Sequence, residues 1–127
     1  MIEYKVTVLE DGTNEWYLNG KLHREDGPAV EFANGDKFWH RNSMLHREDG
    51  PAIEYANGDK FWHRNSMLHR EDGPAVEYAN GTKKWYLNGM SYTQEDFLLK
   101  TQPVLELTLD EIATAFNINV NNLKIKK

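Results

Sequence analysis

A repeat of 23 residues runs through most of the chain and constrains the fold more than any other feature of the sequence. The segment from Leu22 to Met44 is identical to the segment from Leu45 to Met67 at 21 of 23 positions, and the segment from Leu68 to Met90 matches the second copy at 17 of 23. A fixed period of this length is typical of repeat proteins, in which each unit packs mainly against its neighbours. We therefore expect repeat units at about 1–21, 22–44, 45–67 and 68–90, followed by a separate region at 91–127.

Each unit has the pattern of one β-hairpin. In the two middle copies, short runs rich in aromatic and β-branched residues flank Asn34-Gly35 and Asn57-Gly58. Asn-Gly between such runs predicts a hairpin with a type I′ turn, which needs positive φ at both central residues. That turn pairs Val30 with Trp39 and Glu31 with Phe38, and alternation along the strands then separates two faces. The inner face, lined by the tryptophans, takes Val30, Phe32 and Trp39, and the outer face takes Glu31, Phe38 and His40.

The predicted fold is mainly β. It is an antiparallel meander of about four β-hairpin repeats that form an elongated twisted sheet, with a small C-terminal α/β cap. The junctions between units read Asp-Gly-Pro, which is typical turn chemistry because Pro fixes φ at the start of the next strand. The first unit has Val8 where later units carry glutamate, and Tyr4, Val6 and Val8 are apolar in alternation, so we expect the tail to cover this face.

The tail has its own signals. Thr93 and Thr108 each begin a capping-box pattern, which predicts two short helices, the first of them ending before Pro103. The segment Leu123–Lys126 alternates like a final strand. We expect residues 91–127 to cap one end of the sheet, because the terminal units of a repeat array must hide an open edge.

Composition and charge exclude several classes of protein. The chain has 127 residues and no cysteine, which excludes disulfide scaffolds, thiolate metal sites and thiol nucleophiles. No apolar run approaches the length of a membrane span, and the first residues lack a signal-peptide core, so we expect a cytoplasmic protein without membrane contact. The formal net charge of −5 disfavours nucleic acid as a partner.

The segment His-Arg-Glu-Asp occurs three times, beginning at His23, His46 and His69, and such residues can bind metal or perform acid–base catalysis. Equivalent residues in successive hairpins lie two strands apart, about 9–10 Å, whereas zinc holds each nitrogen ligand at about 2.0–2.1 Å. Ser43 and Ser66 occupy turn positions, and the glycines follow the repeat period without forming a phosphate loop. We therefore expect no enzymatic activity, no metal and no cofactor.

Candidate partner-binding residues lie in columns on the expected outer face. Aromatic and imidazole side chains alternate there with arginine, and aromatic residues and arginine carry much of the binding energy at protein interfaces. The same side chains would also serve in cross-strand pairs, in a homodimer through a sheet edge or face, or in stacking on single-stranded nucleic acid, which the net charge disfavours. The candidate residues are Tyr17, Phe38, His40, Arg41, Phe61, His63, Arg64 and Tyr86.

The pattern Gly-x-x-x-Trp-Tyr-Leu-Asn-Gly at Gly12–Gly20 and Gly81–Gly89 resembles the MORN repeat, as does the period. The longer pattern at Trp16–Ala29 is similar to a MORN-like repeat of short proteins in tailed phages and large DNA viruses. The resemblance implies stacked hairpins that serve as a scaffold for contacts with other molecules. It further implies a phage-encoded, non-enzymatic protein that docks on a host protein and inhibits a host defence complex, as anti-CRISPR proteins do. The alternative from another class is a structural or self-assembling scaffold.

Overall fold

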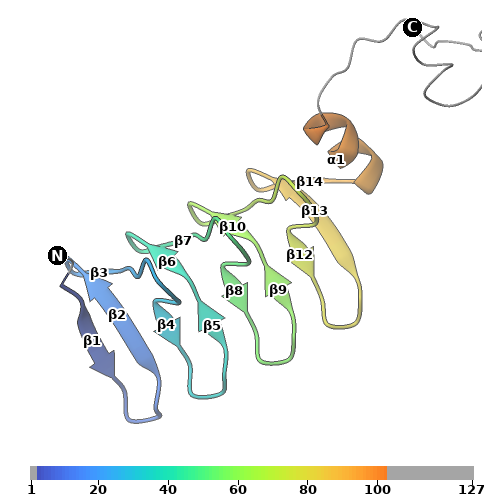
Figure 1. Ribbon diagram of the computed structural model, residues 1–127. Helices are drawn as coiled ribbons and strands as arrows, with labels where there is room; N and C mark the ends of the chain where they lie inside the picture. The colour runs from blue at the N-terminus through green and yellow to red at the C-terminus, as the bar shows by residue number, and fades with distance from the viewer. Residues whose placement is uncertain (1–2, 103–127) are drawn as a thin grey trace, which may run out of the picture.

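The structure is a computed structural model that describes residues 3–102. Over that range the chain forms an open antiparallel sheet with a helix at its C-terminal end (Figure 1). The expected mainly β meander of repeats is confirmed. The elements are β1 (Lys5–Val8), β2 (Asn14–Leu18), β3 (Lys21–Leu22), β4 (Val30–Glu31), β5 (Lys37–Phe38), β6 (His40–Arg41), β7 (Met44–Leu45), β8 (Ile53–Glu54), β9 (Lys60–Phe61), β10 (His63–Arg64), β11 (Met67–Leu68), β12 (Val76–Glu77), β13 (Lys83–Leu87), β14 (Met90–Tyr92) and α1 (Gln94–Thr101).

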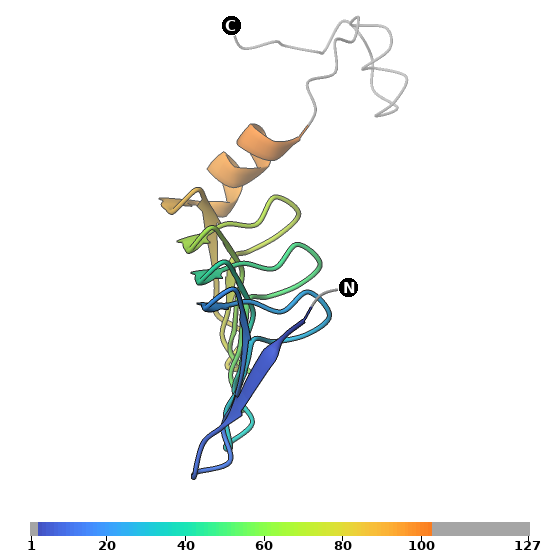
Figure 2. The ribbon, with the colours of Figure 1, turned by 90° about the vertical axis from the view of Figure 1, so that its left-hand side faces the viewer.

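The main sheet of the described residues has ten strands, in the order β1-β2-β4-β5-β8-β9-β12-β13-β14, with β3 paired to β2. The pairs β6–β7 and β10–β11 stand apart from it as two short ribbons. Because neighbours along the chain are neighbours in the sheet, each full unit lengthens the array by two strands, or about 9–10 Å. In side view the sheet is a single layer, and the loops between units project from one of its faces (Figure 2).

The turn at Asn34-Gly35 differs from the expected type I′ turn. The Phe32 N–H donates to the Asp36 carbonyl at 2.9 Å, which closes a loop of the three residues between them. Gly35 has φ +100°, whereas Asn34 is not among the residues with positive φ. The Asn34 Oδ1 accepts the N–H of Asp36 at 3.0 Å and so fixes the loop. This is the three-residue hairpin loop that ends on a left-handed glycine.

Each full unit also contains a second hairpin, with a two-residue loop, where the sequence pattern predicts only a turn. Strands β6 and β7 pair Arg41 with Met44, so Asn42 and Ser43 form a two-residue loop. Both residues have positive φ, 51° and 67°, as a type I′ turn requires. The type I′ turn therefore exists in this protein, but at the Asn-Ser or Asn-Gly pair between hairpins.

The longer loop shifts the strand register by one residue. Val30 lies opposite Phe38 and Glu31 opposite Lys37, so the expected pairing of Val30 with Trp39 is wrong. A shift of one residue moves every side chain of a strand to the other face. We call the two faces by their large side chains. The aromatic face carries Val30, Phe32 and Phe38, and the tryptophan face carries Glu31, Lys37 and Trp39.

The buried core is a narrow row of small and branched side chains. The expectation that tryptophan lines the core is therefore wrong. All four tryptophans are half-buried. In three of them an arginine side chain covers the ring in place of an apolar layer. The row repeats an Ala followed by a β-branched residue at the start of β4, β8 and β12, all at most 7% exposed: Ala29, Val30, Ala52, Ile53, Ala75 and Val76.

Helix α1 closes the C-terminal end of the array against β13 and β14 (Figure 1). Thr93 caps it, accepting the N–H of Asp96 at 3.1 Å, and Phe97 is buried beneath it, which confirms the first predicted helix. By the repeat period a fourth His-Arg-Glu-Asp segment would occupy residues 92–95, and the helix begins within that stretch. The second predicted helix and the final strand lie outside the described residues. Within that range Val6 and Val8, at the opposite end, stay exposed.

Candidate protein-binding face

Five rings from successive units form a continuous row along the aromatic face, which we call the aromatic ladder. It consists of Phe32, Phe38, Tyr55, Phe61 and Tyr78. Their consecutive centroid distances are 5.0, 5.8, 5.6 and 5.9 Å, with interplanar angles of 70–89°. Edge-to-face contacts of this kind contribute about 0.5–1.5 kcal/mol each beyond the area they bury. The edge-to-face contacts between neighbouring rings therefore hold the side chains of the ladder in place.

Within the described residues no second layer covers the ladder. Phe32 is 38% exposed, and the other four rings are half-buried. The loops between units cover the tryptophan face instead, because Arg24 and Arg47 of those loops stack on Trp16 and Trp39. The ladder ends at Lys84, whose ammonium lies 5.6 Å from the Tyr78 ring.

Phe38 and Phe61 are the two candidate residues that the structure places in the ladder. His40 stacks beside Phe38 at 6.4 Å, and burial lowers the pKa of both His40 and His63. The Nδ1 atoms of these two histidines are buried without a hydrogen-bond partner in the described part of the chain. Burial therefore favours the neutral form of both imidazoles. Tyr17 and Tyr86 occupy the equivalent positions in the terminal units and are also half-buried.

Arg41 and Arg64 lie away from the ladder, in two clefts between successive loops. The clefts have volumes of about 530 and 490 Å³, and Trp39 and Trp62 are among their lining residues. Arg41 lies 3.7 Å from Glu48, and Arg64 has the equivalent contact with a glutamate at 4.0 Å. The structure therefore divides the candidate residues between two surfaces.

The three His-Arg-Glu-Asp segments hold neighbouring units together. His23 Nδ1 accepts the N–H of Asn42 at 3.0 Å, which requires the proton of the neutral ring to sit on Nε2, 3.5 Å from Glu25. Arg24 lies over Trp16 at 4.0 Å and donates to Asp26, to the Pro28 carbonyl and to Glu31. The same contacts recur in the next two loops. The stack on tryptophan joins each segment to the preceding unit, and the hydrogen bonds hold the loop within its own unit.

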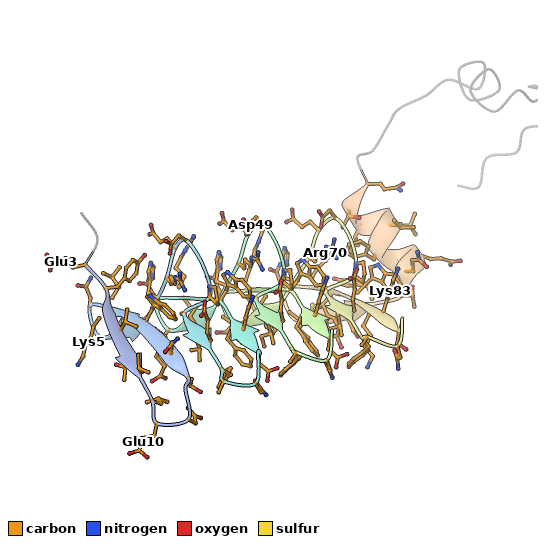
Figure 3. All side chains as sticks on the ribbon, turned by 60° about the horizontal axis from the view of Figure 1, so that its bottom comes forward. Glu3, Lys5, Glu10, Asp49, Arg70 and Lys83 are labelled. Carbon is orange, nitrogen blue, oxygen red and sulfur yellow. The ribbon has the colours of Figure 1, made fainter. Side chains whose placement is uncertain are left out.

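The tips of these loops are acidic. Six carboxylates are 53–88% exposed there: Glu25, Asp26, Glu48, Asp49, Glu71 and Asp72. Figure 3 shows Asp49 at the tip of its loop, pointing away from the sheet. A phosphate backbone would meet these charges on the loop side of the molecule.

Sequence reasoning missed three members of the ladder, Phe32, Tyr55 and Tyr78. Their positions are aromatic in all three full copies, whereas the position of Phe38 and Phe61 is lysine in the last. That persistence was the available signal, but the type I′ register placed Phe32 on the opposite face. With the observed register all five rings share one face.

Comparison with protein-family models, with curated proteins and with solved structures finds no match to this chain. The assignment of the repeat to the MORN-like type stays a prediction from its motifs. In the described residues no helix is long and apolar enough to cross a membrane. Over the same residues, no group of three or more histidine, aspartate or glutamate side chains is arranged to hold a metal ion.

Proposed function

We propose that the protein is a non-enzymatic repeat module that binds another protein through its aromatic ladder. The observation that carries this proposal is an uninterrupted row of five aromatic rings on a sheet face without a covering layer among residues 3–102. Rigid aromatic side chains supply large contact areas at low conformational cost. A contiguous apolar patch of this kind is typical of an interaction site.

The difference between copies favours binding over a purely structural role. Lys84 stands in the third full copy where Phe38 and Phe61 stand in the first two. The equivalent strand still forms there, with Val76 opposite Lys84 in the same register. Since the fold accepts lysine at this position, the sheet does not require phenylalanine there, and the two rings are free to serve a partner.

The partner that we propose is a protein of the host cell. The repeat resembles those of tailed phages, and the acidic loop tips disfavour nucleic acid and anionic membranes. Inhibition of a host defence complex, as anti-CRISPR proteins perform it, is the activity we propose for such a complex. Fold likeness alone does not select that activity, so the partner must be identified directly.

The test is capture of the partner by the full chain from host lysate, with quantification of the bound protein. The substitutions Phe38→Lys and Phe61→Lys copy the lysine of the third unit and remove two rings from the ladder. We expect them to lower the affinity for the captured partner at least about tenfold, as the loss of a hot-spot residue does. The converse substitution Lys84→Phe extends the ladder and should raise the affinity.

The matched control removes the two arginines of the clefts, Arg41→Ala with Arg64→Ala. These side chains lie away from the ladder, so the captured partner should be retained. Thermal unfolding of all variants separates a lost contact from a lost fold. Retention by the lysine variant together with loss by the arginine variant would move the binding site to the clefts and contradict the proposal.

A further inference from the structure

The N-terminal edge of the sheet presents open backbone groups. Among residues 3–102, β1 pairs only with β2. The N–H of Leu9 donates to Thr13 at 2.8 Å, so Leu9, Thr7 and Lys5 direct their backbone groups toward β2. Val6 and Val8 alternate with these residues and therefore direct their N–H and C=O groups outward.

The side chains of the same two residues are unusually exposed. Val6 is 48% and Val8 69% exposed on the tryptophan face, where Val6 lies opposite Trp16. In later units the loop that precedes the equivalent strand lies over this region, where Arg24 donates to Glu31 at 3.2 Å, and among residues 3–102 no loop makes this contact at Val8. Figure 3 shows Lys5 of β1 at the outer end of the sheet. An exposed apolar edge of this kind is a template for strand pairing.

Charges along the sheet indicate which strand fits this edge. On the tryptophan face a row of cross-strand pairs alternates in sign, running Glu31, Lys37, Glu54, Lys60, Glu77 and Lys83. The row starts at the neutral pair Val8–Asn14 and ends on the cation of Lys83. A strand that pairs with β1 must therefore be uncharged opposite Val8.

Head-to-tail stacking of two copies does not meet that condition. Continuing the repeat register, in which Lys37 lies opposite Glu54, would place the ammonium of Lys83 against Val8. Between units, the Asp36 carboxylate accepts the N–H of Ala56 at 2.7 Å, and Thr82 at the C-terminal edge replaces this acceptor. The two ends of the array are not complementary.

We propose that β1 pairs antiparallel with β1 of a second copy, about a two-fold axis at Thr7. Within β1, only Val6 and Val8 direct their backbone N–H and C=O groups away from β2. The hydrogen-bonded register that uses both residues sets Val6 opposite Val8 of the second copy and Val8 opposite Val6. Each such pair exchanges two hydrogen bonds, and the four valines form an apolar cluster. Both aromatic ladders then lie on the same side of the joined sheet. This inference does not depend on the proposed function.

The register is tested by single cysteines, since the chain has none of its own. Thr7 would face Thr7 of the second copy with about 4.5 Å between Cα atoms, which suits a disulfide. Val8 would lie about 8 Å from its own equivalent, beyond the disulfide limit of about 7 Å. Under mild oxidation we expect Thr7→Cys to form a covalent dimer faster than Val8→Cys. Equal or reversed rates would overturn the register.

The association itself is tested by sedimentation equilibrium of the full chain from about 1 µM to about 1 mM, the range for small interfaces. We expect a monomer–dimer equilibrium with a mass approaching twice 14.8 kDa. Val8→Lys should abolish the dimer, whereas Met90→Lys, on an equally exposed residue of the opposite edge strand, should leave it intact. A monomer at every concentration, an open series of oligomers, or a dimer lost only in the Met90 variant would overturn the proposal.

Discussion

Arg47 shows how a polar side chain can take the place of an apolar layer. Its guanidinium lies 3.9 Å from the Trp39 ring centre and donates to Asp49, to the Pro51 carbonyl and to Glu54 at 3.1–3.2 Å. Only a planar fork can stack on the ring and direct several N–H groups at once. The arginine therefore closes the tryptophan face and links Trp39 of the preceding unit to Glu54 of its own unit.

Replacing Arg47 by lysine should destabilise the protein although the charge is kept. The point charge of lysine loses the stacked geometry and at least one charge-assisted hydrogen bond, so we expect a loss of about 1–3 kcal/mol in the free energy of unfolding. Urea denaturation measures this loss. Arg41→Lys is the control, because Arg41 is more exposed and has one carboxylate at 3.7 Å. Similar losses in the two variants would show that the stacking contributes nothing.

His40 and His63 should make the stability depend on pH. Burial lowers the pKa of both below the ordinary value of 6.5, so as pH falls through that value the unfolded chain takes up protons first. The free energy of unfolding is then unaffected by these groups at about pH 8 and falls toward about pH 5. The paired substitution His40→Tyr and His63→Tyr copies the tyrosines of the terminal units, Tyr17 and Tyr86.

Urea midpoints of both proteins at the two pH values provide the measurement. The tyrosine variant should lose less stability on acidification than the natural protein. The other three histidines are the same in both proteins and cancel in the comparison. An unchanged pH dependence would show that the buried Nδ1 atoms are not the cause.

At the scale of elements, the turns of the first two full copies offer an internal comparison. Ala33 and Ala56 occupy the first position of identical three-residue loops, where proline is well accommodated. The N–H of Ala56 donates to Asp36 at 2.7 Å, whereas that of Ala33 has no partner among the described residues. Ala33→Pro should therefore be neutral or slightly stabilising, and Ala56→Pro should cost about 1–2 kcal/mol. Equal effects in thermal unfolding would exclude a role for this bond between units.

The repeat period predicted the meander because equal units that follow one another can bury their faces only against their neighbours. It did not predict the register. Asn34-Gly35 fits both a type I′ turn and the last two positions of a three-residue loop, and the choice depends on backbone bonds from Phe32 and Asp36. One residue of difference decided which rings share a face, so Phe38 and Phe61 were found as candidates while Tyr55 was not.

At the scale of the whole molecule, the array behaves as a sum of similar units. The N–H of Trp39 donates to Ala52 and that of Trp62 to Ala75, both at 2.7 Å, so consecutive interfaces are built alike. In such an array stability is the sum of unit terms and nearest-neighbour interfaces. Deleting a complete unit should therefore leave the remaining units folded, whereas deleting part of a globular core would not.

Deletion of residues 45–67 joins Met44 to Leu68 and restores the same sequence context at the junction. We expect the shortened chain to fold, with a lower free energy of unfolding and a smaller urea m-value, because less surface is exposed on unfolding. It also loses Tyr55 and Phe61, so the ladder shrinks and the partner should bind more weakly. Duplication of the same segment should reverse the sign of all three changes. An unfolded deletion variant would show that the middle unit is not interchangeable. A partner affinity that stays constant across the three lengths would mean that the ladder does not bind as a continuous row.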